Sequence, residues 1–217
     1  MDSFLVLGQK YFPYILKGAV VTVEITVGSL ILGTVIGMVI AIARLSKHAI
    51  CSWPAAIYVE IIRDTPALLQ LFIIYFGLAG YGIKLDPLSA SILTLGIIGG
   101  AYLSEVFRAG IQSVERGQIE AALSIGMRDH QVMRRVILPQ AFLLILPPFG
   151  NFLIALIKDT SLVLTISVPE IMYQSYNVAS QTYRSMEVYA LAAIIYFGLC
   201  FPLSRFAKWL EKLRPPP

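Results

Sequence analysis

The chain has 217 residues, of which 57% are hydrophobic and 14% charged, with a formal net charge of +4. The charged share lies well below the roughly 25% of an average soluble domain, and the mean hydropathy is +0.75. Because polar residues are too few to cover a soluble surface, the sequence predicts an all-α integral membrane protein. The basic residues form no continuous run, which argues against a nucleic-acid partner.

Five predominantly apolar runs are long enough to cross a bilayer, which takes about 20 residues. In chain order they are Gly18–Ala43, Ala67–Ile83 with an upstream extension through Ala55–Val59, Leu88–Phe107, Val136–Ile157 and Val188–Ser204. The second run is interrupted around Pro66 and the fourth contains Pro139, Pro147 and Pro148, so we expect both to be bent or broken. The sequence therefore predicts a single transmembrane domain of about five helices over residues 1–217.

Basic residues in the connections fall unequally on the two sides of these spans. One side holds Arg44, Lys47, Arg63, Arg108, Arg116, Arg128, Arg134, Arg135, Arg205, Lys208, Lys212 and Arg214, whereas the other holds Lys10, Lys17, Lys84, Lys158 and Arg184. By the positive-inside rule the richer side faces the cytoplasm. We therefore expect the N-terminus outside and the C-terminus in the cytoplasm.

Two spans carry pairs of glycines four residues apart, Gly33 with Gly37 and Gly96 with Gly100. Small residues at this spacing let helices approach closely. The pattern is compatible with tight packing inside one chain and with specific dimerisation.

The longest polar connection, residues 108–135, is predicted to face the cytoplasm and to be structured. Ile119, Ala122 and Leu123 fit a short amphipathic helix that ends at a glycine cap, Gly126. Asp129 is expected to cap a second short helix. These short helices offer few apolar residues to the membrane, which favours docking to another protein.

A longer pattern in this connection identifies a family. Glu120-Ala121-Ala122, then Gly126, then Val136-Ile137-Leu138-Pro139 closely resembles the EAA signature of permeases from ATP-binding cassette (ABC) importers, with Val136 where isoleucine is usual. Further segments resemble the polar amino-acid branch: Gly18–Glu24, Tyr58–Pro66, Ala101–Glu105 and Lys158–Leu162. Asp64 departs from that branch, in which glycine is commoner.

The resemblance implies the type I ABC importer permease fold and a function in moving polar L-amino acids by alternating access across a prokaryotic plasma membrane. It implies a segment that docks on the ATPase subunit, carried by Glu120, Ala121, Ala122 and Gly126 with support from Arg116. The implied partners are two ATP-binding subunits, which would hold ATP and Mg²⁺, an extracytoplasmic solute-binding protein and a second permease copy. We expect that copy to be identical, giving a homodimer, and no cofactor in this chain.

The sequence offers little for catalysis by the chain itself. It contains no G-x-x-x-x-G-K-[ST] phosphate loop. His48 and His130 lie in connections without cysteine or carboxylate at metal-ligand spacing, so no metal site is expected. The alternative function is a passive channel for small polar solutes, which would conduct without nucleotide.

Two carboxylates are the main candidates for a substrate site, because charges inside spans usually mark function or a buried partner. Glu105 lies on a polar or small helical stripe and is expected either to line a pathway or to pair with Arg108. Asp159 follows the fourth span, and its neighbour Lys158 is an alternative partner. Together the two acids would favour a basic amino acid. Candidate donors to the substrate carboxylate are a broken-helix N-terminus, Ser104, Thr65, Gln70 and Lys158.

Three other features have expected structural roles. Arg63 is expected near the cytoplasmic edge as an anchor or partner of an acidic neighbour, and Glu24 at the outer interface. Ser167-Val168-Pro169-Glu170 is typical of a capping box, which predicts that Ser167 caps a short outer helix from Ile171. That helix is either a gate or a connector.

Overall fold

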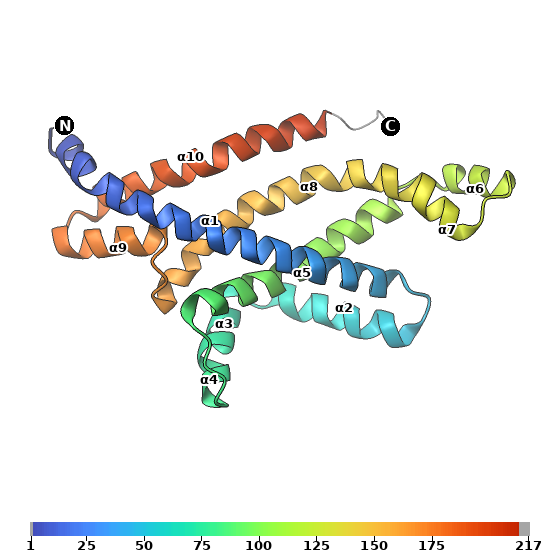
Figure 1. The fold of residues 1–217 in the computed structure, drawn as a ribbon, viewed down its shortest axis with the longest axis horizontal. Helices are drawn as coiled ribbons and strands as arrows, with labels where there is room; N and C mark the ends of the chain where they lie inside the picture. Colours follow the sequence, from blue (N-terminus) through green and yellow to red (C-terminus); the bar gives the residue numbers. More distant parts are fainter. Residues whose placement is uncertain (1, 213–217) are drawn as a thin grey trace.

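The computed structural model describes residues 2–212, which form helices joined by short connections and contain no strand within that range (Figure 1). The helices are α1 Asp2–Leu45, α2 Ala49–Asp64, α3 Ala67–Phe72, α4 Leu78–Gly80, α5 Pro87–Gln112, α6 Arg116–Ser124, α7 Asp129–Val132, α8 Leu138–Asp159, α9 Ile171–Thr182 and α10 Ser185–Glu211. Within the described residues, four helices are long and apolar enough to cross a membrane, or five spans if the bent segment α2 to α4 counts as one. This confirms the all-α bundle of about five spans.

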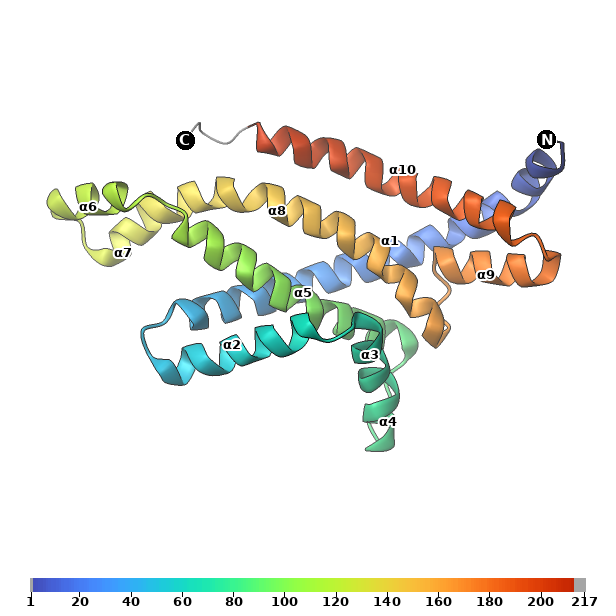
Figure 2. The same ribbon diagram turned by 180° about the vertical axis from the view of Figure 1, so that it is seen from behind.

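Helices α1, α5, α8 and α10 run along the long axis of the molecule (Figures 1 and 2). The connection between α1 and α2 and the short helices α6 and α7 lie at one end of this axis, and α10 runs toward that end but stops short of it. The start of α1 and helix α9 lie at the other end. The ends of the described chain are therefore on opposite sides of the bundle, as an odd number of crossings requires.

The glycine pairs of α1 and α5 bring these two helices into close contact within one chain. A Cβ added to Gly33 would lie 3.1 Å from the carbonyl oxygen of Gly96, and one added to Gly37 would lie 2.9 Å from the Cβ of Leu103. A Cβ added to Gly100 would lie 2.4 Å from a methyl group of Ile36. Of the two readings of the glycine pattern, the structure shows tight packing inside the chain.

The expected interruption of the second span is a sharp bend. The chain changes direction by 106° between Ala49–Asp64 and Ala67–Gly80. As a result, α3 and α4 project sideways from the bundle. Pro66 disfavours helical geometry at the residue before it, and Thr65 has extended dihedral angles. The long apolar run from Ala67 therefore does not continue the line of α2.

The fourth span differs from expectation. Helix α8 continues without a break through Pro147 and Pro148. The irregular turn lies instead before it, at the π-helical segment Met133–Ile137, where the amide of Leu138 donates to the carbonyl of Met133. The expected break in this span is therefore wrong, and no broken-helix N-terminus arises at this proline pair.

The outer helix is present but begins differently. Glu170, not Ser167, caps α9, and its carboxylate accepts hydrogen bonds from the amides of Met172 at 2.8 Å and Tyr173 at 2.7 Å. Ser167 ends the preceding 3₁₀ turn with φ of 63°. Glu170 is fully buried and also accepts from the hydroxyl of Tyr196 at 2.8 Å. The outer helix is thus joined to α10 through one carboxylate.

Candidate functional site

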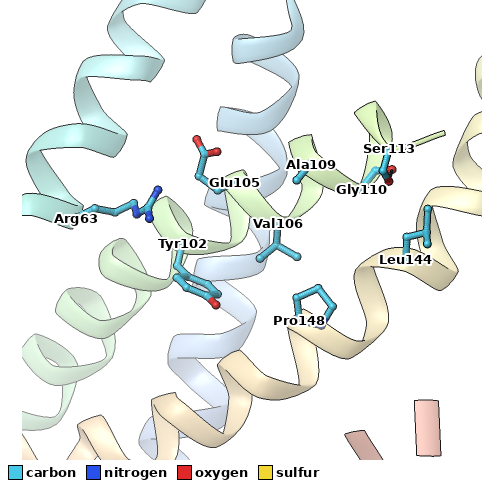
Figure 3. A pocket seen from close by; sticks show the side chains of 9 residues that line it. All are labelled: Arg63, Tyr102, Glu105, Val106, Ala109, Gly110, Ser113, Leu144 and Pro148. Carbon is cyan, nitrogen blue, oxygen red and sulfur yellow. Dashed lines mark hydrogen bonds between the residues drawn. The ribbon is translucent and has the colours of Figure 1, made fainter. Parts of the chain in front are cut away.

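A cavity of about 530 Å³ lies between α2, α5 and α8 (Figure 3). Helix α5 supplies most of its lining through residues spaced three or four apart, which share one side of a helix. The lining residues are Arg63, Tyr102, Glu105, Val106, Ala109, Gly110, Ser113, Leu144 and Pro148. The wall therefore combines one carboxylate, one guanidinium and a tyrosine with an otherwise mainly apolar surface.

Glu105 lines this cavity and also joins two arginines. Its Oε2 accepts from Nη2 of Arg108 at 2.7 Å, and its Oε1 forms an ion pair with Nη1 of Arg44 at the end of α1. Arg108 is held further by Oε1 of Gln112, at 2.6 Å from its Nη1. The two readings of Glu105 are therefore compatible, because the same carboxylate borders a cavity and is an ion-pair partner.

Arg63 is not at the edge of the bundle, contrary to expectation. Helix α2 starts beside the end of α1, so position 63 lies fourteen residues, or about 21 Å, along α2 from that end. Figure 3 shows its guanidinium directed toward Tyr102 and the cavity. The bend after α2 explains the difference, because the sequence reading placed the inner membrane surface at this interruption.

The predicted donors Thr65 and Gln70 stabilise the bend between α2 and α3. The side-chain amide of Gln70 donates to the carbonyl of Ile62 at 2.7 Å and to the hydroxyl of Thr65 at 2.8 Å. The same hydroxyl donates to the carbonyl of Ile61 at 2.7 Å. Ser104 is fully buried and donates to the carbonyl of Ala101 at 2.8 Å. None of these three lines the cavity beside Glu105.

Lys158 and Asp159 are exposed at the end of α8. Lys158 lines a separate cavity of about 330 Å³ against α10, with Tyr196 and Cys200 among its other residues. Asp159 lies eleven residues beyond Pro148, about 16 Å further along the helix. Since Pro148 borders the cavity of Glu105, the structure does not bring the two predicted carboxylates together.

The predicted docking segment is a helix with a glycine terminus. Gly126 has φ of +83°, its amide donates to the carbonyl of Leu123 at 2.9 Å, and the amide of Met127 donates to that of Ala122 at 3.1 Å. This pair of hydrogen bonds is the Schellman motif that ends helices at a left-handed residue. The predicted glycine cap is confirmed.

The docking candidates divide between two faces of α6. Arg116, Glu120 and Ala121 are exposed, whereas Ala122 is only 6% exposed and packs in an apolar cluster with Val132. Ala122 therefore holds α6 against the following segment rather than facing outward. Asp129 is the first residue of α7 and does not cap it; the side chain of Gln131 instead accepts from the amide of Arg128 at 2.9 Å.

Two residues of this site carried a weak sequence signal. Tyr102 precedes Glu105 by three positions, so the helical period alone places it on the same side of α5. Arg44 is one of several basic residues at the ends of spans. Its pairing with Glu105 depends on how α1 crosses α5. The glycine pairs of the two spans indicate close approach, but they do not specify which side chains then lie opposite one another.

The bundle of about five candidate spans, the cavity between its helices and the exposed capped helix fit a membrane permease. Residues 33–214 match the model of the family described as "Binding-protein-dependent transport system inner membrane component", and the chain belongs to this family. The resemblance seen in the sequence is therefore confirmed.

Individual relatives agree along nearly the whole chain. In Bacillus subtilis (strain 168), the probable amino-acid ABC transporter permease protein YckA is 41% identical, covering 95% of this chain and 91% of its own length. The L-cystine permease protein TcyB is 38% identical (94% and 88% covered) and the arginine permease protein ArtQ is 36% identical (92% and 92%). The crystal structure of an amino acid ABC transporter with histidines superimposes with a TM-score of 0.91 at 37% identity, covering 96% of this chain and 97% of that one.

This membership fixes the general role of the chain. It is a multi-pass inner-membrane protein with the type I ABC importer permease fold, and it is the permease subunit of an amino-acid importer. ATP hydrolysis belongs to a separate ATP-binding subunit, and a solute-binding protein delivers the substrate. The chain itself is therefore not an enzyme.

Proposed function

We propose that this permease moves polar L-amino acids by alternating access, with the cavity beside Glu105 as part of their path. The observation that carries this proposal is an intramembrane carboxylate, Glu105, on the wall of a cavity that also receives Arg63. An amino acid has an ammonium and a carboxylate group, and the wall offers one group of each opposite charge. Charge-assisted hydrogen bonds of this kind are about twice as strong as neutral ones.

Within this class, a basic amino acid is the substrate we propose to test first. The sequence argument for a basic substrate requires Glu105 and Asp159 to bind it together. The structure instead places these carboxylates at different levels of the bundle. A basic substrate would therefore meet them in succession, and at Glu105 it would compete with Arg44 and Arg108. The relatives named for arginine and L-cystine show that this family branch serves more than one substrate class.

The predicted donors to the substrate carboxylate have a smaller role in this proposal than the sequence suggested; they are Ser104, Thr65, Gln70 and Lys158. The first three are engaged in hydrogen bonds that hold helices and the bend, so their contribution would be to the shape of the path. Lys158 stays a candidate partner for a substrate carboxylate, because its side chain borders a cavity near the outer half of α8 and α10. Arg63 is the stronger candidate at the level of Glu105.

We further propose that the end holding α6 and α7 faces the cytoplasm of a prokaryotic cell, with the N-terminus outside. Arg44, Lys47, Arg116 and Arg134 belong to segments at this end, and α10, which carries Lys208, runs toward it; both observations support the positive-inside argument. Arg63 was counted with these basic residues, but its position far along α2 means that it no longer supports the positive-inside argument. Arg214 lies outside the described residues. Here Glu120, Ala121 and Arg116 would meet an ATPase subunit that holds ATP and Mg²⁺.

Two permease copies, which we propose to be identical, and two ATPase subunits would make the transporter. One chain supplies only part of the wall of a gated path, since its cavity is open rather than enclosed. Crosslinking in membranes between cysteines placed on α5 should give a dimer of this chain. Crosslinks only to a chemically different permease would contradict the homodimer.

The substrate role of Glu105 is tested by Glu105→Gln, with Glu24→Gln as the matched control because Glu24 is exposed on α1. We expect Glu105→Gln to lower substrate binding by the membrane complex about tenfold, since one charge-assisted bond is lost, while basal ATP turnover survives. Binding is measured with labelled arginine, lysine, histidine, glutamine and cystine in nanodiscs that lack the solute-binding protein. Equal binding by both variants would contradict the role of Glu105.

A further inference from the structure

A second groove lies on the opposite side of α5 from the cavity of Glu105. It has a volume of about 480 Å³ between α1, α5 and α8, and Thr34 is its only lining residue with a polar side chain. Its base is formed by Ala41, Phe107 and Ala141, which are 2%, 9% and 1% exposed, and the more exposed Met38 and Phe142 flank it. From Leu138 to Phe149 it follows α8 for about 16 Å, close to half the roughly 30 Å hydrocarbon core.

A basic hollow adjoins the end of this groove. His130, Gln131, Arg134 and Arg135 line a space of about 470 Å³. Both arginines are exposed, and neither joins an ion pair within the described part of the chain. The π-helical turn places Arg134 about one turn before Leu138 on the same side of the helix. Arg134, which lines the basic hollow, therefore lies about one turn from Leu138, which lines the end of the apolar groove.

The side of α5 on which the groove lies indicates what contacts it. On α5, Phe107 and Ile111 line the groove, whereas Tyr102, Glu105 and Ala109 line the cavity on the other side. At 100° per residue these sets point in nearly opposite directions. If the cavity faces the path and the second permease copy, as proposed above, the groove faces the bilayer.

We propose that the hollow and the groove together form a site for an anionic phospholipid of the leaflet at the α6–α7 end. The guanidinium groups of Arg134 and Arg135 would bind the phosphate headgroup, and one acyl chain would lie along Ala41, Phe107 and Ala141. Basic pockets between membrane helices at the cytoplasmic side bind acidic headgroups in this way. The site places a lipid against both the docking segment and the helix that carries Glu105.

The test uses the assembled transporter, permease with its ATPase subunit, in nanodiscs of equal phosphatidylglycerol and phosphatidylcholine. After extraction, mass spectrometry measures the ratio of the two lipids that stay bound. For Arg134→Gln/Arg135→Gln we expect the preference for phosphatidylglycerol to fall about tenfold or more. Arg205→Gln/Lys208→Gln is the matched control, because it removes the same charge from exposed positions in the last two turns of α10.

A second pair of variants tests the acyl groove. Met38→Trp should reduce the total retained phosphatidylglycerol, whereas Val39→Trp should not, because Val39 is exposed on α1 outside the groove. An unchanged lipid ratio in the arginine variant, or an equal loss in its control, would overturn the proposal. Loss of the ATPase subunit with the lipid ratio unchanged would also overturn it, by assigning the arginines to a protein interface.

Discussion

Single residues of this permease are constrained in different ways, and Gly126 is constrained by its backbone alone. Its φ is +83°, and a Cβ added there would meet no other atom within 4 Å. A side chain would therefore not clash but would strain the left-handed turn that ends α6, by roughly 1–2 kcal/mol and more for a β-branched residue. The position of α6, the helix proposed to dock on the ATPase subunit, depends on this turn.

We expect Gly126→Val to abolish substrate-stimulated ATP turnover while leaving membrane insertion and substrate binding largely intact. Gly117→Val is the matched control, since Gly117 lies in the same helix with ordinary dihedral angles and open space around its Cβ. Turnover is measured in proteoliposomes with the ATPase and the solute-binding protein. If Gly126→Val lost substrate binding and kept stimulated ATP hydrolysis, the segment from Glu120 to Gly126 would be only a connection between helices and not the coupling element.

Glu170 is constrained by burial. Burial raises the pKa of this carboxyl above its ordinary value of 4.5, although the amides of Met172 and Tyr173 and the hydroxyl of Tyr196 oppose the shift. Between pH 4.5 and the raised pKa the folded chain holds a proton that the unfolded chain has lost. Its contribution to stability is therefore full below pH 4.5 and is lost as pH rises through the folded pKa.

The expected consequence is a pH-dependent difference between the wild type and Glu170→Gln. The free energy of unfolding of the wild type should fall relative to the variant as pH rises from 4.5. Thermal unfolding of the detergent-purified permease across pH 4.5 to 8 measures this difference. A difference that is constant with pH would show that Glu170 titrates like an exposed carboxyl, and a difference that grows in the opposite direction would show that folding lowers its pKa.

Among the elements, the contact of α1 with α5 sets the geometry on which the site depends. Both helices bring glycine to the crossing, and Gly100 faces a methyl group of Ile36 and the hydroxyl of Tyr58. Close backbone contact of this kind gains dispersion energy where no water is available to drive association. It also positions Arg44 beside Glu105.

Gly100→Ala should separate α1 from α5 and destabilise the permease by about 1–3 kcal/mol through overpacking. Gly198→Ala in α10 has open space around its Cβ and should be neutral or slightly stabilising, because alanine favours helix by about 1 kcal/mol. Melting temperatures of the two purified variants provide the comparison. A Gly100→Ala protein as stable as Gly198→Ala would mean that the crossing is looser than the structure shows.

Sequence reasoning succeeded for elements with local signals and failed where packing decides. The spans, the helix ending at Gly126 and the bend near Pro66 follow from apolar length, glycine and proline, and all are present. Pro147 and Pro148 were expected to bend or break α8, and the helix continues across them without a break. Proline removes one hydrogen bond per residue, and whether a helix tolerates the loss depends on neighbours that the sequence does not specify.

For the whole molecule, the sequence singled out Glu105 and its pairing with Arg108 but not the rest of its surroundings. The family motif and the cost of a charge in a span both pointed to this residue. The depth of Arg63, the pairing of Glu105 with Arg44 and its distance from Asp159 arise from the bend after α2 and from the crossing of α1 and α5. Contacts between residues far apart in the chain leave no periodic pattern, so they could not be predicted.

The central claim is that this chain forms part of the path through which an ATP-driven importer moves polar amino acids. It is tested most directly by uptake of labelled amino acids into proteoliposomes that contain the permease, its ATPase subunit and its solute-binding protein. We expect uptake only when ATP and the solute-binding protein are both present, and its loss in Gly126→Val. Flux that continues without ATP and survives Gly126→Val would contradict the claim and identify a passive channel.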